Sequence, residues 1–133
     1  MRKEIREYDK NNNLIHYENS KGNESWQEFD EKNNCIYYKD SNGFEFWREY
    51  DKNNNLIHYK YSSSYESWRE YDKNNNLIHY KDFNDLEGWY KYNDKNKQIK
   101  ITEQEFKQIK RRKIKQELYL NNKKRLRFEI MDI

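Results

Sequence analysis

The sequence Glu-Tyr-Asp-Lys-Asn-Asn-Asn-Leu-Ile-His-Tyr occurs three times without a change, at residues 7–17, 49–59 and 70–80. A diverged copy, Glu-Phe-Asp-Glu-Lys-Asn-Asn-Cys-Ile-Tyr-Tyr, fills residues 28–38. The starting points differ by 21 residues or by twice that number, with no insertion. A fixed period of this length is typical of repeat proteins, so we expect one array of stacked units.

The apolar residues of this chain are mostly aromatic. It contains 13 Tyr, 6 Phe and 4 Trp, but no Ala, Val or Pro. A charged fraction of 38% with few aliphatic residues is typical of disordered segments, yet such segments contain few aromatic residues. We therefore expect a folded array whose core is built from rings, with polar groups at their edges.

Each repeat has the pattern of two strands and two turns. Dense Tyr, Trp, Phe and Ile alternate with clusters of Asn, Asp, Gly and Ser every ten or eleven residues. This pattern predicts a mainly β fold, an antiparallel meander of about ten strands over residues 1–101. The last repeat is more polar, with Gln98 and Lys100, as expected of a unit that caps an array.

The strand register follows from assumptions about the two kinds of turn. We take Asp-Lys-Asn-Asn-Asn as a three-residue hairpin loop with a left-handed third residue, and Asn42-Gly43 as a two-residue loop. Tyr8 then faces Leu14, and alternating Tyr and Trp form a row that ends in Ile5 and Ile101. The rings of this row are the candidate aromatic binding face: Trp26, Trp47, Trp68, Trp89, Tyr38, Tyr59 and Tyr80, with Tyr17 beside them. In this register the His and Arg residues lie on the opposite face.

Residues 102–133 are expected to pack as a cap of the same domain. Thr102 and Glu105 match a capping box, which predicts a helix from Glu103 to about Leu120. Asn121-Asn122 is expected to break this helix. The alternation of Leu126, Phe128 and Ile130 then predicts one more short strand.

The charge is distributed unevenly along the chain. Residues 1–99 carry a net charge of −3, whereas residues 100–127 carry +8. Such asymmetry favours a nucleic-acid or acidic-protein partner, although a solvated helix face is the alternative. The candidate contacts to phosphate or to an acidic partner are the basic residues of the predicted helix: Lys107, Lys110, Arg111, Arg112, Lys113 and Lys115.

No pattern in the sequence indicates a metal site or a catalytic site. The equivalent residues His16, His58 and His79 would lie at least two strands apart, about 9.6 Å, which is too far for one ion to bridge. Residues 9–13 resemble the start of a calcium loop, but Leu14 stands where that loop requires Gly. With no nucleophile–base pattern or phosphate-binding loop, we expect no enzyme, no metal and no cofactor.

Cellular location is suggested by what the sequence does not contain. Cys35 is the single cysteine, so no disulfide can form within the chain. The first residues show no apolar signal-peptide core, and no stretch reaches the apolar length of a membrane helix. We therefore expect a cytoplasmic protein without a membrane partner.

The spacing Tyr-Asp-x-x-Asn-Asn-Leu, with the next Tyr-Asp about 21 residues later, resembles the YD repeats of Rhs and teneurin-type proteins. The matching positions are Tyr8, Asp9, Asn12 and Leu14; Phe29, Asp30, Asn33 and Cys35; Tyr50, Asp51, Asn54 and Leu56; and Tyr71, Asp72, Asn75 and Leu77. Asn replaces the turn Gly of the family throughout. The resemblance covers about residues 5–101 and implies β-hairpins that wind into a curved sheet.

Three functions follow as hypotheses. The first is a non-enzymatic protein-binding inhibitor. In overall type the chain resembles small phage or mobile-element anti-defence proteins, including anti-CRISPR proteins, whose partner is a host-defence or nucleic-acid-handling complex. The second is an RNA- or DNA-binding module that uses the basic helix. The third, implied by the YD resemblance, is an immunity or antitoxin partner of a polymorphic toxin. A sheet this wide exposes an aromatic face, so a homodimer is a further possibility.

Overall fold

The computed structural model describes the backbone of residues 3–131 and the side chains of residues 3–127. Ten strands follow one another in chain order and a single helix ends the described chain. The strands are β1 (Ile5–Tyr8), β2 (Leu14–Glu18), β3 (Glu24–Phe29), β4 (Cys35–Asp40), β5 (Glu45–Tyr50), β6 (Leu56–Tyr61), β7 (Glu66–Tyr71), β8 (Leu77–Asp82), β9 (Glu87–Tyr92) and β10 (Gln98–Ile101), and the helix is α1 (Glu103–Met131). The predicted mainly β meander is confirmed.

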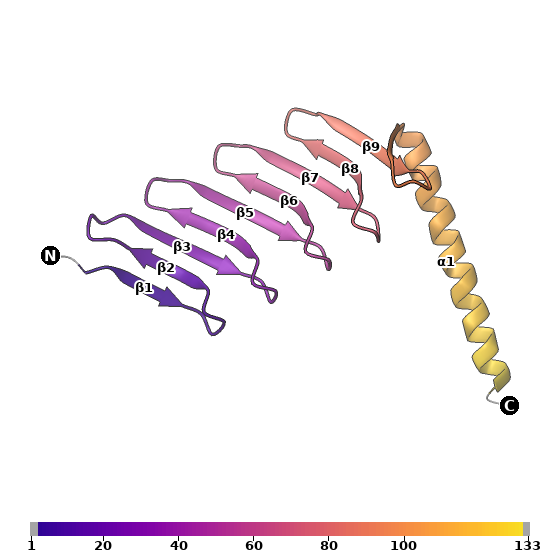
Figure 1. Cartoon of the computed structure of the whole chain (residues 1–133), viewed down its shortest axis with the longest axis horizontal. Helices are drawn as coiled ribbons and strands as arrows, with labels where there is room; N and C mark the ends of the chain where they lie inside the picture. The colour runs from indigo at the N-terminus through magenta and orange to yellow at the C-terminus, as the bar shows by residue number, and fades with distance from the viewer. Residues whose placement is uncertain (1–2, 132–133) are drawn as a thin grey trace. The chain divides into compact units, whose positions relative to one another are not determined.

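The described chain divides into two compact units between Glu87 and Gly88. The first unit holds β1 to β8, and Figure 1 shows each of these strands beside the next. This unit contains only strands among its described residues, so it supplies no second layer to cover either face of its sheet. Most of its strand side chains are accordingly half-buried. The predicted domain boundary at residues 101–102 stays a prediction.

All nine turns between these strands have the same backbone geometry. In the turn after β1, the Asp9 amide donates to the Asn13 carbonyl at 2.9 Å, and the Asn12 amide donates to the Asp9 carbonyl at 3.1 Å. The third loop residue is always left-handed, with φ between 59° and 86°. These residues are Asn12, Gly22, Asn33, Gly43, Asn54, Ser64, Asn75, Asp85 and Asn96. The three-residue loop predicted for Asp-Lys-Asn-Asn-Asn is confirmed.

The two-residue loop expected at Asn42-Gly43 is wrong. A two-residue turn of the Asn-Gly kind needs positive φ at both residues, but only Gly43 has it. The Asp40 carboxylate instead accepts hydrogen bonds from the amides of Asn42, at 2.9 Å, and Phe44, at 3.1 Å. Because Asp40 organises this turn as Asp9 and Asp51 organise theirs, the loop contains three residues, Ser41 to Gly43.

A β-bulge adds a second shift of register. Tyr8 pairs with Leu14 as expected, but Glu7 then pairs with His16, so Ile15 is the extra residue. The same shift occurs between β3 and β4, between β5 and β6, and between β7 and β8. A shift of one residue moves side chains to the other face of the sheet. The expected alternating row of Tyr and Trp therefore does not form in the first unit.

Asparagine side chains join the successive turns at one end of the strands. Asn13 Nδ2 donates to Asn33 Oδ1 at 2.8 Å, and Asn34 Nδ2 donates to Asn54 Oδ1 at 2.9 Å. Asn55 Nδ2 donates to Asn75 Oδ1, also at 2.9 Å. The run of three asparagines thus has two roles, since one residue adopts the left-handed conformation and the side chains link neighbouring repeats.

We expect Asn54→Ala to lower the free energy of unfolding by about 1–2 kcal/mol, because alanine lacks the short polar side chain that lets Asn adopt the left-handed conformation. Asn54→Gly is the matched control, because glycine removes the same side-chain hydrogen bond and adopts that conformation without strain. Urea unfolding monitored by tryptophan fluorescence measures both variants. Equal losses in the two would show that the inter-turn hydrogen bond, and not backbone conformation, makes Asn54 important.

The second unit holds β9, β10 and α1. Trp89 pairs with Ile101 as the sequence predicts, and Ile101 and Phe106 are both buried. The Thr102 hydroxyl accepts a hydrogen bond from the Glu105 amide at 3.2 Å, which confirms the predicted start of the helix. The predicted end is wrong, since α1 continues through Asn121-Asn122 to Met131 and no final strand forms at Leu126. Asn costs less than about 0.7 kcal/mol inside a helix, so the surrounding Leu, Lys and Arg outweigh it.

Candidate functional site

The two faces of the first unit have different chemistry. Cross-strand partners share a face, and neighbours along a strand lie on opposite faces. Trp26 pairs with Lys39 and the adjacent Gln27 with Tyr38, so Trp26 and Tyr38 lie on opposite faces. The Glu/His/Trp face carries Glu7, His16, Glu24, Trp26, Glu28, Tyr37, Glu45, Trp47, Glu49, His58, Glu66, Trp68, Glu70 and His79. The Arg/Tyr face carries Arg6, Tyr17, Gln27, Tyr38, Phe46, Arg48, Tyr59, Tyr61, Arg69 and Tyr80.

Each described histidine of the Glu/His/Trp face contacts carboxylates from neighbouring strands. His16 Nδ1 lies 3.0 Å from Glu7 Oε1, and His16 Nε2 lies 2.7 Å from Glu24 Oε1. The imidazole also stacks on Trp26, with ring centroids 5.7 Å apart and planes at 15°. A neutral imidazole has one N–H, whereas here both nitrogens face acceptors, so the arrangement fits the protonated ring.

The same arrangement recurs in a later repeat. His58 lies 3.2 Å from Glu49 and 2.8 Å from Glu66, and stacks on Trp68 at 5.3 Å and 9°. His79 Nε2 lies 2.7 Å from Glu87 Oε2. The sequence reasoning placed the histidines in a polar row opposite the tryptophans. The structure instead stacks His16 on Trp26 and His58 on Trp68, as parts of the scaffold.

We expect the free energy of unfolding to fall as the pH rises above about 6.5. Hydrogen bonds to Glu7 and then Glu24 raise the pKa of His16 above its ordinary value of 6.5. Burial lowers the pKa of His58, but hydrogen bonds to Glu66 and Glu49 outweigh it and the net shift is upward. A raised folded-state pKa gives stability that is full below the unfolded pKa and is lost as the pH rises through the folded value.

Urea unfolding at several pH values between about 5.5 and 8.5 measures this dependence. The double variant His16→Gln, His58→Gln should have a nearly flat profile across that range, since it lacks two titrating rings. A wild-type profile that is already flat, or that rises with pH, would show that the carboxylates do not hold these rings in the charged form.

One repeat of the Glu/His/Trp face differs from the others. Tyr37 stands where the other repeats have histidine, and its hydroxyl donates to Glu45. Its ring lies 5.7 Å from Trp47 at an angle of 51°, so the pair is tilted rather than stacked. Glu28, which corresponds to Glu7 and Glu49, faces no imidazole here. Beside this pair is an open hollow of about 380 Å³, lined by Glu28, Ile36, Tyr37, Trp47, Arg48 and Glu49.

The Arg/Tyr face is held by arginine–aromatic contacts. The Arg6 guanidinium carbon lies 5.5 Å from the centroid of Tyr17, and that of Arg48 lies 4.1 Å from the centroid of Phe46. Arg69 lies between Tyr59, at 5.3 Å, and Tyr80, at 5.5 Å. Such contacts contribute about 0.5–1 kcal/mol each at exposed sites. These contacts give the arginines of this face a structural role.

A continuous cluster of rings lies on and beside the Arg/Tyr face in the middle of the array. We call it the aromatic patch, and each ring centroid lies 4.9–6.2 Å from that of the next. Its members are Tyr38, Phe44, Phe46, Tyr59, Tyr61, Tyr65 and Phe83. Phe46 is buried, whereas 43% of Phe44 and 46% of Phe83 are exposed.

Most of this patch could not be found from the repeated residues, because its rings occupy positions that differ between repeats. At a spacing of 21 residues, Phe44 and Tyr65 correspond to Asn23, and Phe46 corresponds to Ser25 and Ser67. Similarly, Phe83 corresponds to Ser41 and Ser62. The signal was present in these departures from the repeat, which place rings where other units have small polar residues. Only Tyr38 and Tyr59 of the patch belong to the predicted aromatic binding face.

The predicted row of Trp and Tyr therefore does not form one face in the first unit, and a binding role for these rings stays a prediction. Trp26, Trp47 and Trp68 lie on the Glu/His/Trp face, and each has close to 40% of its surface exposed. Tyr38, Tyr59 and Tyr80 lie on the Arg/Tyr face. Trp89 belongs to the second unit, where it pairs with Ile101. The loop length and the bulge separate rings that the predicted register joins.

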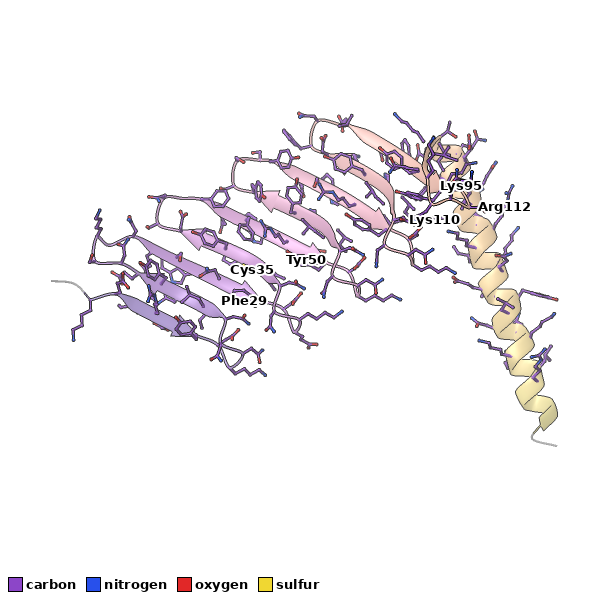
Figure 2. All side chains as sticks on the ribbon, in the orientation of Figure 1. Phe29, Cys35, Tyr50, Lys95, Lys110 and Arg112 are labelled. Atoms are coloured by element: carbon purple, nitrogen blue, oxygen red, sulfur yellow. The ribbon has the colours of Figure 1, made fainter. Side chains whose placement is uncertain are left out.

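The basic residues predicted as contacts lie on α1, where Figure 2 shows Lys110 and Arg112 projecting from the helix. Lys107 forms an ion pair with Glu103 at 3.0 Å, and the Lys110 ammonium lies 4.9 Å from the centroid of Phe106. The other predicted contacts are exposed: Arg111, Arg112, Lys113 and Lys115. Because four consecutive residues span more than one helical turn, Lys110–Lys113 point in all directions around the axis.

Two further findings concern the part of the chain that the structure describes. No group of three or more His, Cys, Asp or Glu in residues 3–127 is arranged to hold a metal ion. No described helix combines the length and apolarity needed to cross a membrane.

Cys35 is half-buried, its thiol donates to the Tyr37 carbonyl at 3.3 Å, and burial raises the pKa of that thiol. Figure 2 labels Cys35 with its cross-strand neighbour Phe29 and the equivalent residue Tyr50.

Comparison with solved structures identifies similar hairpin arrays. The crystal structures titled TcdB2-TccC3-Cdc42 and TcdB2-TccC3-TEV match 72% of this chain, each with a TM-score of 0.54, at 15% and 14% sequence identity. The fold is YD-repeat-like. At this identity the likeness shows the fold alone, and it confirms the hairpin architecture that the YD resemblance implied. The match covers 5% of the length of those chains.

Comparisons at the level of sequence add no relative. No family model matches this chain, and no curated protein matches it. The YD-repeat-like array thus resembles known proteins in its backbone geometry.

Proposed function

We propose that this chain is a non-enzymatic protein-interaction module that binds its partner through the aromatic patch. The observation that carries this proposal is the departure of the patch from the repeat. Rings at these positions are not required by the repeat, since other units fold with Asn or Ser there. Phe44, Tyr65 and Phe83 occupy such positions.

The composition of the patch fits a protein partner. Aromatic residues and Arg are enriched at the energetically important centres of protein interfaces. Here the exposed rings of Phe44 and Phe83 flank buried or half-buried rings, with Leu86 64% exposed in the same stretch of turns. Contiguous apolar surface on a soluble chain marks an interaction site. The described residues of the first unit supply no second layer over this face.

The similar solved structures support the same class of function. Their titles name several proteins together, and the YD-repeat-like array is part of that assembly. A toxin-associated role, as a partner or immunity protein, is one narrower form of the proposal. Inhibition of a host-defence complex is another narrower form, motivated by the small, charge-dense chain. Both assign the chain a binding role without a catalytic step.

Crosslinking with matched variants tests the proposal. The double variant Phe44→Asn, Phe83→Ser replaces each exposed ring with a polar residue found at an equivalent position, Asn23 for Phe44 and Ser41 or Ser62 for Phe83, so the fold should be retained. The wild type and the variant are crosslinked to their partner in cells of the source. We expect the yield of crosslinked partner to fall by more than about 90% in the variant, because it lacks two interface rings worth about 2 kcal/mol each. The variant Leu118→Ser, Leu120→Ser, which removes exposed apolar residues from α1, should keep the partner. Equal yields from wild type and the patch variant would refute the proposal.

The exposed cations of α1 favour a second candidate, a nucleic-acid or acidic-protein contact in the second unit. Every described side chain from Lys110 to Arg127 is exposed. Phosphate contacts would make binding fall steeply with salt because counterions are released. The test is binding of single-stranded and double-stranded oligonucleotides at two salt concentrations, with Arg111→Glu, Arg112→Glu as the disrupting variant. Salt-independent binding, or no loss in the variant, would exclude it.

A further inference from the structure

We propose that β1 pairs with β1 of a second copy of this chain, in an antiparallel arrangement centred on Ile5, so that two sheets join edge to edge. Such an interface is isologous, because both copies contribute the same strand. The proposal goes beyond the proposed function. It uses the edge of the sheet, whereas the proposed partner binds the aromatic patch, which contains no residue of β1.

Among the described residues of the first unit, β1 is an edge strand. Each of β2 to β7 lies between two hydrogen-bonded neighbours, whereas β1 pairs with β2 alone, and Figure 1 shows it at the outer end of the row. All residues of β1 are exposed, with 41% of Ile5 and 54% of Tyr8 accessible. The outer side of an edge strand presents a row of backbone donors and acceptors that can pair with another strand.

The backbone of β1 is oriented for this pairing. The Asp9 amide donates to the Asn13 carbonyl and therefore points into the hairpin with β2. Backbone groups alternate in direction along a strand, so those of Ile5 also point to β2, and those of Glu4 and Arg6 point outward. Centring two antiparallel copies on Ile5 places Glu4 opposite Arg6 of the second copy, and Arg6 opposite Glu4. Each of these pairs can then exchange both of its backbone hydrogen bonds.

The charges of this strand are self-complementary in that register. Glu4 faces Arg6 of the second copy, Lys3 faces Glu7 of the second copy, and each pair occurs twice. Within one copy, Arg6 Nη2 already lies 3.2 Å from Glu4 Oε2, and both side chains are about half exposed. Opposite charges stabilise cross-strand pairs, whereas like charges directly opposite destabilise them. Registers centred on Arg6 or on Glu7 would place like charges opposite each other, so the register centred on Ile5 is favoured.

The residues that make β1 self-complementary are departures from the repeat. Lys3 corresponds to Glu24, Glu45 and Glu66, and Glu7 corresponds to Glu28, Glu49 and Glu70. Internal strands in the same register would therefore place Glu opposite Glu. Glu4 likewise stands where these repeats have Ser25, Phe46 and Ser67. Edge strands are often protected by Lys side chains, which repel one another. In β1 the charges instead attract a second copy.

Sedimentation equilibrium of the whole chain measures the association. Small interfaces are weak, so the protein is studied from about 10 µM to about 1 mM. We expect a reversible monomer–dimer equilibrium with no larger species. Raising the salt from about 0.05 M to about 0.5 M should weaken the dimer several-fold, because exposed charge pairs are screened.

Charge exchange between copies tests the register. Glu4→Lys alone, or Arg6→Glu alone, places like charges opposite each other in two pairs and should weaken the dimer at least about tenfold. An equal mixture of the two variants should dimerise again, because each introduced charge then faces its opposite in the other copy. Lys21→Glu, which makes the same change of charge as Arg6→Glu in an exposed turn, should dimerise as the wild type does. Circular dichroism checks that all variants fold.

Oxidation of single-cysteine variants locates the centre of the pairing. In a Cys35→Ser background, Ile5→Cys should form a covalent dimer, because paired Cα atoms lie within the span of a disulfide. Arg6→Cys should not, since residue 6 faces residue 4 of the second copy. The reverse result would contradict the register centred on Ile5.

Three other results would overturn the proposal. A chain that stays monomeric across the concentration range has no such dimer. Species that grow beyond the dimer indicate head-to-tail association. A dimer that persists in both charge variants but is lost in Phe44→Asn, Phe83→Ser forms through the aromatic patch. None of these results decides whether the patch binds a different protein, which the crosslinking experiment measures separately.

Discussion

Replacing Phe46 by Ser should lower the free energy of unfolding by about 3 kcal/mol, at the low end of the range for truncating a large buried ring. Among residues 3–87, Phe46 is the hydrophobic residue that is buried, with 9% of its surface exposed. It stacks on Tyr38 at 5.4 Å and 8° and lies edge-on to Tyr61 at 6.2 Å. The Arg48 guanidinium lies over the same ring, 4.1 Å from its centroid, so the variant also removes this cation–π contact.

The comparison that makes this result informative is Phe44→Ser. Phe44 belongs to the same patch but is 43% exposed, so its loss should cost well under half as much. Ser67 occupies the position equivalent to Phe46 and is fully buried, so the backbone tolerates serine there. Chemical unfolding of both variants measures the difference. Similar small losses would mean that the middle of the array is held by its turns and strand pairing alone, without a core.

Replacing Asp51 by Ala should lower the free energy of unfolding by about 1.5 kcal/mol, as expected for several solvent-accessible hydrogen bonds lost from one turn. The Asp51 carboxylate accepts from the amides of Asn53 and Asn55, each at 2.9 Å, and from Asn55 Nδ2 at 3.1 Å. These contacts hold the three-residue loop closed. Because Asn55 also links this turn to Asn75, the loss should extend to the next repeat.

Asp51→Asn is the matched control for geometry and charge. Asn19 and Asn93 make the same backbone contacts in other turns, so the amide should keep most of the stability. Burial raises the pKa of Asp51, but hydrogen bonds from Asn55 and Asn53 outweigh it and leave the pKa below its ordinary value of 3.8. The stability from this shift is present above pH 3.8 and is lost as the pH falls through the folded pKa, and Asp51→Asn should lack that acid dependence. A large loss in Asp51→Asn at neutral pH would contradict the turn-capping role.

The fold could be predicted from local sequence because each repeat contains residues that strongly favour its turns. Asp at the first position and Asn at the left-handed third position determine a three-residue loop, and regular aromatic spacing determines the strands between loops. The YD resemblance pointed to the same hairpins. Capping by Thr102 likewise fixed the start of α1, since a cap is a contact between residues close in sequence.

The register could not be predicted, because it depends on loop lengths and on a bulge that the local sequence does not determine. Asn42-Gly43 favours a two-residue loop on its own, and Asp40 favours a three-residue loop. The bulge at Ile15 has no local signal in the residues that flank it. The longer loop and the bulge each shift the strand pairing by one residue. The predicted register therefore placed Trp and Tyr on the same face, whereas Trp26 and Tyr38 lie on opposite faces. For the same reason the candidate site changed from a repeated Trp/Tyr row to the aromatic patch.

The end of α1 shows a different limit. Asn121-Asn122 was expected to end the helix, but two residues of modest propensity do not interrupt 29 residues of helix in which most neighbours favour it. Over so short a stretch, the spacing of Leu126, Phe128 and Ile130 is compatible with either a strand or a helix. Side chains at 128 and 130 lie outside the described side chains, so their contacts play no part in this conclusion.

Disulfide trapping of strand register tests the central claim, which is that two chemically distinct faces result from the three-residue loops. In a Cys35→Ser background, His58→Cys with Trp68→Cys places the two cysteines on directly paired residues of β6 and β7. Tyr59→Cys with Trp68→Cys is the matched pair, in which the side chains point to opposite faces. Paired Cα atoms in a sheet lie about 4.5–5.5 Å apart, within the range that a disulfide spans. The account predicts that mild oxidation links the first pair and leaves the second reduced. Efficient linkage of the second pair, with the first unlinked, would contradict it.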